Sequence, residues 1–224
     1  MALNLTHKFA NKIKKSISYL QKIYLILETG RTIQFANNPQ NLILKKPINI
    51  ANPECIFLGD NVNFGPRCFL YAIKKYPDKK MKSQDYFMDI QVFEPSIIIG
   101  NNVTATTNVI ISAVKEIVIE DDVMLASNIF ISDHQHGYNT ANIPYKYQAI
   151  SNIKPIKIGK GCWIGQNCTI MPGVKIGNNT IIGANSVVTK NIPEQCIAIG
   201  SPAKIIKKWN DIKKSWSLYP YAKY

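Results

Sequence analysis

Two histidines in one short polar segment are the residues of this chain best suited to chemistry. Residues 132–138 read SDHQHGY and hold two of the three histidines among the 224 residues. A neutral imidazole can take the proton of a hydroxyl group near pH 7, which turns a weak nucleophile into a reactive one. Either His134 or His136 could act in this way, and Asp133 could hold an imidazole in one tautomer. The alternative is a polar surface loop without a chemical role.

A period of six residues predicts the elements that position this segment. Aliphatic residues recur at every sixth position near the C-terminus, four of them followed by glycine: Ile158, Ile164, Ile170, Ile176, Ile182 and Val188. A repeat this short cannot bury its own apolar residues, so it must stack on neighbouring repeats. Helices and flat sheets have other periods. We therefore expect a coil with three short sides, one repeat per side.

The same period occurs earlier in the chain, with interruptions. It is marked by Leu58, Phe64, Leu70, Ile99, Ala105, Ile111, Ile119, Leu125 and Ile131. The step from Ile111 to Ile119 is eight, so one corner carries two extra residues. Longer interruptions at about 71–95 and 132–157 must bulge outward as loops, where function usually lies. A β-sandwich would alternate with a period of two instead.

These patterns divide the chain into three parts. Residues 1–40 form a basic N-terminal segment with an amphipathic helix expected over 5–28, which either packs on the open end of the solenoid or lies on a membrane surface. Residues 41–203 form the solenoid, and 204–224 form a C-terminal tail with a short helix over 204–218. The fold class is therefore all-β with terminal helices.

Composition narrows the class of protein. An apolar content of 46% and a charged content of 18% fit a soluble globular chain. We find neither an apolar stretch of membrane-spanning length nor a secretory signal. Five irregularly spaced cysteines indicate reduced thiols in the cytoplasm, and no zinc signature is present, so no metal is expected. The net charge of +13 fits an anionic lipid, an anionic polymer, a phosphorylated cofactor, a nucleic acid or a plain solvated surface.

One long run carries a resemblance to a known family. Residues 163–208 read WIGQNCTIMPGVKIGNNTIIGANSVVTKNIPEQCIAIGSPAKIIKK. With the histidine loop before it, this run resembles the hexapeptide-repeat acetyltransferases, in the branch that holds galactoside, maltose and xenobiotic acetyltransferases and capsule or lipopolysaccharide O-acetyltransferases. The resemblance is close over about 119–208 and weaker over 41–118. It implies a left-handed parallel β-helix, a homotrimer with active sites between subunits, and acetyl-CoA as co-substrate.

The resemblance also implies roles for individual residues. The family's catalytic histidine generally stands five positions after the inward residue, here Ile131, which favours His136 as the base and leaves His134 as the competitor. The residues implied at the cofactor are Trp163 against the pantetheine arm, Gln166, Ala184, Thr189 and Lys190 along the groove, and Lys204 and Lys207 at the nucleotide phosphates.

The expected function is transfer of acetyl from acetyl-CoA to a sugar hydroxyl of a surface polysaccharide, capsule or lipopolysaccharide, or of its precursor. The lysine-rich 71–95 loop favours an anionic acceptor, and Tyr138, Tyr145 and Tyr147 could stack on a sugar. Open alternatives are an amino-sugar N-acetyltransferase, a xenobiotic acetyltransferase, a structural trimer and a basic nucleic-acid-binding module, although no nucleic-acid partner is expected. The N-terminal helix could touch the inner face of a membrane.

Overall fold

A computed structural model describes residues 15–17, 19–20 and 33–219. In the expected helix over 5–28, the described residues 15–17 and 19–20 are helical, and the other positions lie outside the described residues. Within the described part of the chain, no helix has both the length and the apolar character needed to cross a membrane.

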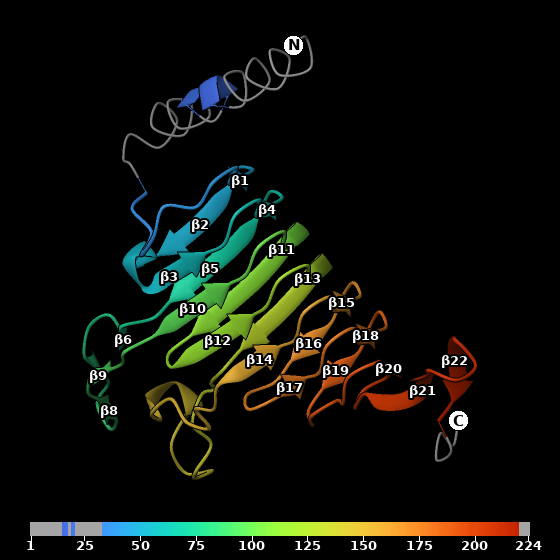
Figure 1. Cartoon of the computed structure of the whole chain (residues 1–224). Helices are drawn as coiled ribbons and strands as arrows, with labels where there is room; N and C mark the ends of the chain where they lie inside the picture. Colours follow the sequence, from blue (N-terminus) through green and yellow to red (C-terminus); the bar gives the residue numbers. More distant parts are fainter. Residues whose placement is uncertain (1–14, 18, 21–32, 220–224) are drawn as a thin grey trace.

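From residue 43 to residue 199 the chain winds into a solenoid of short, parallel strands stacked in three sides (Figure 1). The first side holds β1 (Ile43–Leu44), β4 (Asn63–Phe64), the starts of β11 (Thr104–Ala113) and β13 (Met124–Ser132), β15 (Trp163–Ile164), β18 (Ile181–Ile182) and β20 (Cys196–Ile199). The second holds β2 (Ile48–Ala51), β5 (Cys68–Ala72), the ends of β11 and β13, β16 (Thr169–Ile170) and β19 (Val187–Val188). The third holds β3 (Ile56–Leu58), which follows the 3-10 turn η1 (Pro53–Cys55), then β10 (Ser96–Ile99), β12 (Glu116–Ile119), β14 (Ile156–Ile158) and β17 (Lys175–Ile176).

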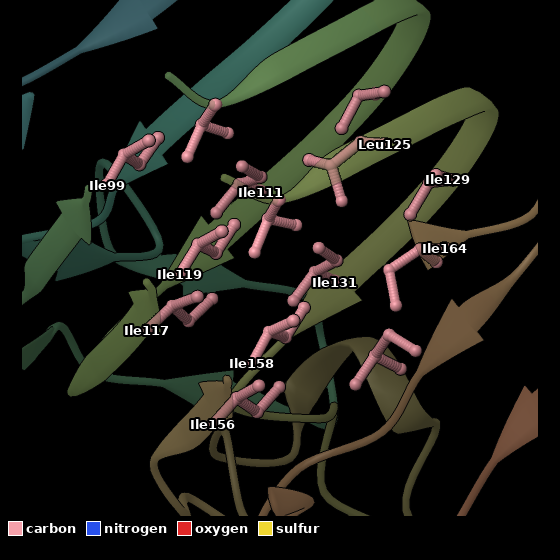
Figure 2. Packing of buried hydrophobic residues seen from close by; sticks show 14 of the residues in the cluster. Ile99, Ile111, Ile117, Ile119, Leu125, Ile129, Ile131, Ile156, Ile158 and Ile164 are labelled. Atoms are coloured by element: carbon pink, nitrogen blue, oxygen red, sulfur yellow. The ribbon is translucent and has the colours of Figure 1, made fainter. Parts of the chain in front are cut away.

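The register of the strands confirms the six-residue period. Ile158 pairs with Ile176, so one coil takes 18 residues (176 − 158). The six aliphatic residues that define the period are all at most 2% exposed. Earlier coils are longer, but their buried aliphatic residues stay in register, and Figure 2 shows Ile99, Ile119 and Ile158 stacked in one column of the core. The core is therefore a set of aliphatic columns running along the solenoid.

Asparagines make the corners of the coils. Asn108, Asn128, Asn167 and Asn185 all have φ between 53° and 60°, a left-handed conformation that asparagine tolerates better than most residues. Their side chains form a ladder in which each amide donates to the next carbonyl oxygen at 2.8, 3.0 and 2.9 Å. The short loops at the corners thus stack with the same register as the strands.

The two interruptions leave the solenoid as ordered segments. Between residues 72 and 96 the chain forms two antiparallel pairs, β6 (Lys75–Tyr76) with β9 (Gln91–Val92) and β7 (Met81–Lys82) with β8 (Phe87–Met88). The second interruption follows β13 and contains the 3-10 turn η2 (Tyr145–Tyr147) before β14 begins. An antiparallel bridge between Gln135 and Ser151 closes its base. Both therefore project from the side of the solenoid (Figure 1).

The helix expected over 204–218 is wrong, because this segment forms an antiparallel hairpin. β21 (Lys204–Asn210) pairs with β20, and β22 (Ser215–Leu218) pairs with β21. The Trp209 and Trp216 rings lie edge to face across the hairpin, 5.5 Å apart. The outer edge of β20 would otherwise expose unpaired backbone groups, so a strand covers it. Tertiary pairing of this kind routinely overrides helix propensity.

Candidate active site

The buried carboxylate of Asp133 organises the histidine loop. It follows the last residue of β13, is fully buried, and accepts backbone N–H bonds from Val114 at 3.0 Å and from Lys115 and Glu116 at 2.8 Å. Those three residues belong to the corner that carries the two extra residues between Ile111 and Ile119. Successive N–H groups facing one carboxylate form an anion-binding concavity. The longer corner therefore wraps around Asp133.

The imidazole of His134 is held by this carboxylate. Its Nδ1 atom lies 2.9 Å from Oδ1 of Asp133 and 3.3 Å from Oγ of Ser132, and the Ser132 hydroxyl donates to the His134 carbonyl at 2.9 Å. Because an ionised carboxylate only accepts hydrogen bonds, Nδ1 carries the proton and Nε2 remains free to accept one. The side chain of His134 is 12% exposed. This arrangement suits a general base fixed in one tautomer.

His136 has a different environment. It is exposed, and its ring packs edge to face against Tyr76 with the centroids 5.4 Å apart. Tyr76 belongs to β6 of the first interruption, so a segment 60 residues earlier in the chain (136 − 76) supports the second histidine. The two candidates for the base are therefore distinct, one anchored to a carboxylate in the wall and the other to an aromatic ring at the surface.

Trp163 and Lys207 lie in one row across the first side of the solenoid. Trp163 on β15 is 45% exposed and is in register with Met124 on one side and Ile181 on the other. Ile181 is in register with Ile197, and Ile197 with Lys207 on β21. Neighbouring strands lie about 4.8 Å apart, so the row runs for roughly 14 Å from the indole to the lysine. It offers an apolar strip that ends in a positive charge.

The remaining residues implied at the cofactor lie at corners or on the hairpin. Gln166 and Ala184 are exposed at the same corner of successive coils, where the Gln166 carbonyl accepts the Asn185 N–H at 2.9 Å. Lys204 pairs with Ile199 on the hairpin. Thr189 and Lys190, by contrast, follow β19 on the second side, so a single chain does not bring them to the corner of Gln166.

Within one chain, the histidine loop and the Trp163 row lie apart. Trp163 pairs with Met124 at the start of β13, whereas His134 follows Ser132 at the end of the same strand. The Asn128 corner, where φ is 59°, lies between them. The two groups of candidate residues therefore occupy different sides of one solenoid.

The buried cysteines are poor candidates for another reactive centre, and the described residues offer no cluster for a metal ion. All five cysteines are free. Burial raises the pKa of Cys162 to about 11 and also raises that of Cys168, so these thiols stay protonated and are poor nucleophiles near neutral pH. In the ranges that the structure describes, no three His, Cys, Asp or Glu side chains gather where they could hold a metal ion.

Sequence reasoning missed several parts of this site. It did not assign the Val114–Glu116 corner to Asp133, and it missed the contact between Tyr76 and His136. The eight-residue step at this corner was a usable signal, because two extra residues in a regular solenoid need a local reason. No comparable signal marks Tyr76, since its partner is distant in the chain.

Comparison with known proteins identifies the repeats. Residues 155–190 match the family model described as bacterial transferase hexapeptide (six repeats). Together with the parallel strands, this match confirms the resemblance to hexapeptide-repeat acetyltransferases and the left-handed parallel β-helix that it implies.

Relatives and solved structures agree with this class. The chain is 39% identical over 127 residues to WbbJ of Escherichia coli K12, whose name assigns it provisionally to lipopolysaccharide biosynthesis as an O-acetyl transferase, covering 54% of this chain and 64% of that protein. It is 36% identical over 130 residues to the galactoside O-acetyltransferase of the same organism, covering 56% and 61%. The N-acyltransferase AntD from Bacillus cereus, solved with dTDP and 3-hydroxybutyryl-CoA, has the same fold, with a TM-score of 0.64 at 21% identity over 81% of this chain and 87% of AntD. The chain thus spans about three fifths of the length of the curated relatives that it matches.

Proposed function

We propose that this protein is an acetyl-CoA-dependent O-acetyltransferase that modifies a sugar hydroxyl of a surface polysaccharide or of its precursor. The observation that carries the proposal is the hydrogen-bonded pair of the buried Asp133 and the partly exposed His134 at the edge of a hexapeptide-repeat coil. The names of the relatives, which include O-acetyltransferases, support the same reaction class.

The catalytic group in this proposal is Nε2 of His134. Asp133 keeps the proton on Nδ1, so Nε2 takes the proton of the acceptor hydroxyl as its oxygen attacks the thioester carbonyl. The same nitrogen then passes that proton to the leaving thiolate, and no covalent enzyme intermediate is needed. The resemblance favoured His136, but the hydrogen-bonded carboxylate gives His134 the better-defined tautomer.

The Trp163 row fits the co-substrate. Acetyl-CoA supplies the acetyl group as an activated thioester, at the end of an extended pantetheine arm whose other end carries phosphates. Trp163 and Ile181 would contact the methylene and methyl groups of the pantetheine arm, and the Lys204 and Lys207 ammonium groups on the hairpin would pair with the phosphates as point charges. Gln166 and Ala184 would line the same groove, and Thr189 and Lys190, which lie at another corner of the chain, would reach the cofactor from a neighbouring subunit.

The proposal includes a homotrimer with active sites between subunits, and the separation of these groups supports a site between subunits. In one chain His134 follows the end of β13, whereas Trp163 on β15 pairs with its start, so the base of one subunit and the cofactor row of its neighbour would meet across an interface. Mixing the inactive variants His134→Ala and Trp163→Ala should then restore part of the activity in hybrid trimers. Failure of such mixtures to gain any activity would place the whole site within one chain.

The acceptor is a saccharide in this proposal, with an anionic one favoured by the charge of +13. Two lysines of the first interruption already pair with carboxylates, Lys74 with Glu54 and Lys80 with Asp89, so these two are less available to an anionic acceptor. Contact of the N-terminal segment with an anionic membrane remains part of the proposal. An amino-sugar or xenobiotic N-acetyltransferase is the alternative, since the same base serves amines.

The test measures release of free CoA from acetyl-CoA with hydroxyl and amine acceptors in parallel, for the wild type, His134→Ala and His136→Ala. We expect acceptor-dependent release to fall by about 10²–10⁴-fold in His134→Ala, the usual contribution of a general base. Loss confined to His136→Ala would assign the base to His136. A preference for amines would support the N-acetyltransferase, and no binding of acetyl-CoA would support a structural trimer.

A further inference from the structure

The two interruptions of the solenoid are joined by a double hydrogen bond. Gln91 on β9 accepts the Ile150 N–H on Oε1 at 2.7 Å and donates from Nε2 to the Ile150 carbonyl at 3.4 Å. One side chain thus pairs with both backbone groups of a residue 59 positions away, as a neighbouring strand would. Ile150 itself is only 6% exposed. The contact is therefore a specific, largely buried interaction and not a chance approach of two surface loops.

Further contacts link Gln91 and Ile150 to the histidine loop. Gln91 is the strand partner of Tyr76, Ser151 next to Ile150 bridges to Gln135, and His136 next to Gln135 packs on Tyr76. These contacts form a closed ring in which each segment is held on two sides. A closed ring fixes the position of the His136 imidazole more firmly than a single contact would, because no one segment can move alone.

A second pair of aromatic side chains, besides Tyr76 and His136, joins the tips of the two interruptions. Tyr86 stacks on Tyr147 with centroids 5.6 Å apart and ring planes inclined by 23°, and Lys146 lies over the Tyr147 ring at 4.8 Å. A hydrogen bond with Ser83 lowers the pKa of the Tyr147 hydroxyl. Aromatic rings with polar edges are the usual surface for a saccharide, since they pack on C–H faces while their hydroxyl and ring nitrogen atoms bond to sugar hydroxyls.

We propose that the two interruptions form one saccharide-binding unit beside the base, in which Tyr76 and His136 contact the acceptor and Gln91 positions them. This inference rests on the proposed function. It gives the two histidines separate tasks, with His134 moving the proton and His136 binding the acceptor. It also accounts for the first interruption, which the solenoid does not need for stacking its coils.

The first experiment tests the positioning role of Gln91 without any sugar acceptor. Amide hydrogen exchange at Ile150 is compared in the wild type, Gln91→Ala and the matched control Gln84→Ala, an exposed glutamine of the same interruption. Loss of the Gln91 side-chain oxygen, which accepts the Ile150 N–H, should speed exchange at Ile150 on the order of tenfold, while Gln84→Ala leaves it unchanged. Equal exchange in all three proteins would overturn the positioning role.

The second experiment tests acceptor binding with p-nitrophenyl glycosides of galactose, glucose and N-acetylglucosamine as probes. Tyr76→Ala should raise the KM for the best glycoside about tenfold, Tyr76→Phe should raise it less, and both should keep the KM for acetyl-CoA. An unchanged glycoside KM, or an equal rise in both KM values, would overturn the saccharide assignment. Absence of transfer by the wild type to every glycoside would count against the proposed function and this assignment together, whereas the exchange experiment would still decide the positioning role.

Discussion

Replacing Asp133 by asparagine tests the central feature of the site. The carboxylate receives four hydrogen bonds, with Val114 and His134 donating to Oδ1 and Lys115 and Glu116 donating to Oδ2. An asparagine side chain has one acceptor oxygen and one amide group that only donates. In either orientation, two of the four donors therefore lose their acceptor.

The size of the effect follows from this count. A buried donor left without an acceptor costs about 1–3 kcal/mol, so Asp133→Asn should lower the free energy of unfolding by roughly 2–6 kcal/mol. When the amide group takes the place of Oδ1, where it donates rather than accepts, the imidazole also loses the acceptor that fixes its tautomer, so in that orientation kcat should fall by a factor on the order of 10²–10⁴. Urea unfolding measures the first quantity, and CoA release at saturating acetyl-CoA measures the second.

Two comparisons make this prediction refutable. Asp85→Asn changes an exposed aspartate and should leave both stability and kcat unchanged. In a His134→Ala background, Asp133→Asn should still lower stability but should add little to the loss of kcat, because the carboxylate acts on the rate through the imidazole. Stability and kcat of Asp133→Asn equal to those of the wild type would refute the reasoning.

Three further predictions follow from other parts of the structure. At pH 8 a maleimide should label Cys55 in the native protein, whereas Cys162, whose pKa is raised to about 11, should react only after unfolding; equal native labelling would contradict its burial. The Lys157 hydrogen bond lowers the pKa of Glu120 below 4.5, so this pair contributes stability above about pH 4.5 that is lost as pH falls through the lowered value. As the pH is lowered from 6 to 3, the urea midpoint of Glu120→Gln should therefore fall less steeply than that of the wild type. Parallel curves for the two proteins would refute this. Asn128→Ala should cost about 2 kcal/mol through its left-handed backbone and two ladder hydrogen bonds, and an unchanged urea midpoint would contradict that role.

The repeat made the solenoid predictable from local sequence. Each coil buries one aliphatic residue per side, so the period of six appears directly in the spacing from Ile158 to Val188. Corners need left-handed conformations, which the asparagine and glycine positions display. The C-terminal hairpin could not be read in this way, because the free edge of β20 decides its conformation, and that edge exists only once the coils have stacked.

The candidate site was likewise predictable from the sequence only in part. The sequence by itself determined the solenoid, the two interruptions, the segment that holds both histidines and the position of Trp163, because each depends on residues close together in the chain. Only the tertiary structure decided which imidazole receives a buried carboxylate, and that Gln91 and Tyr76 support the histidine loop. Asp133 is held by backbone N–H groups 17 to 19 positions away, the Gln91 and Tyr76 contacts join residues 59 and 60 positions apart, and the geometry of all of them depends on how coils of unequal length are stacked.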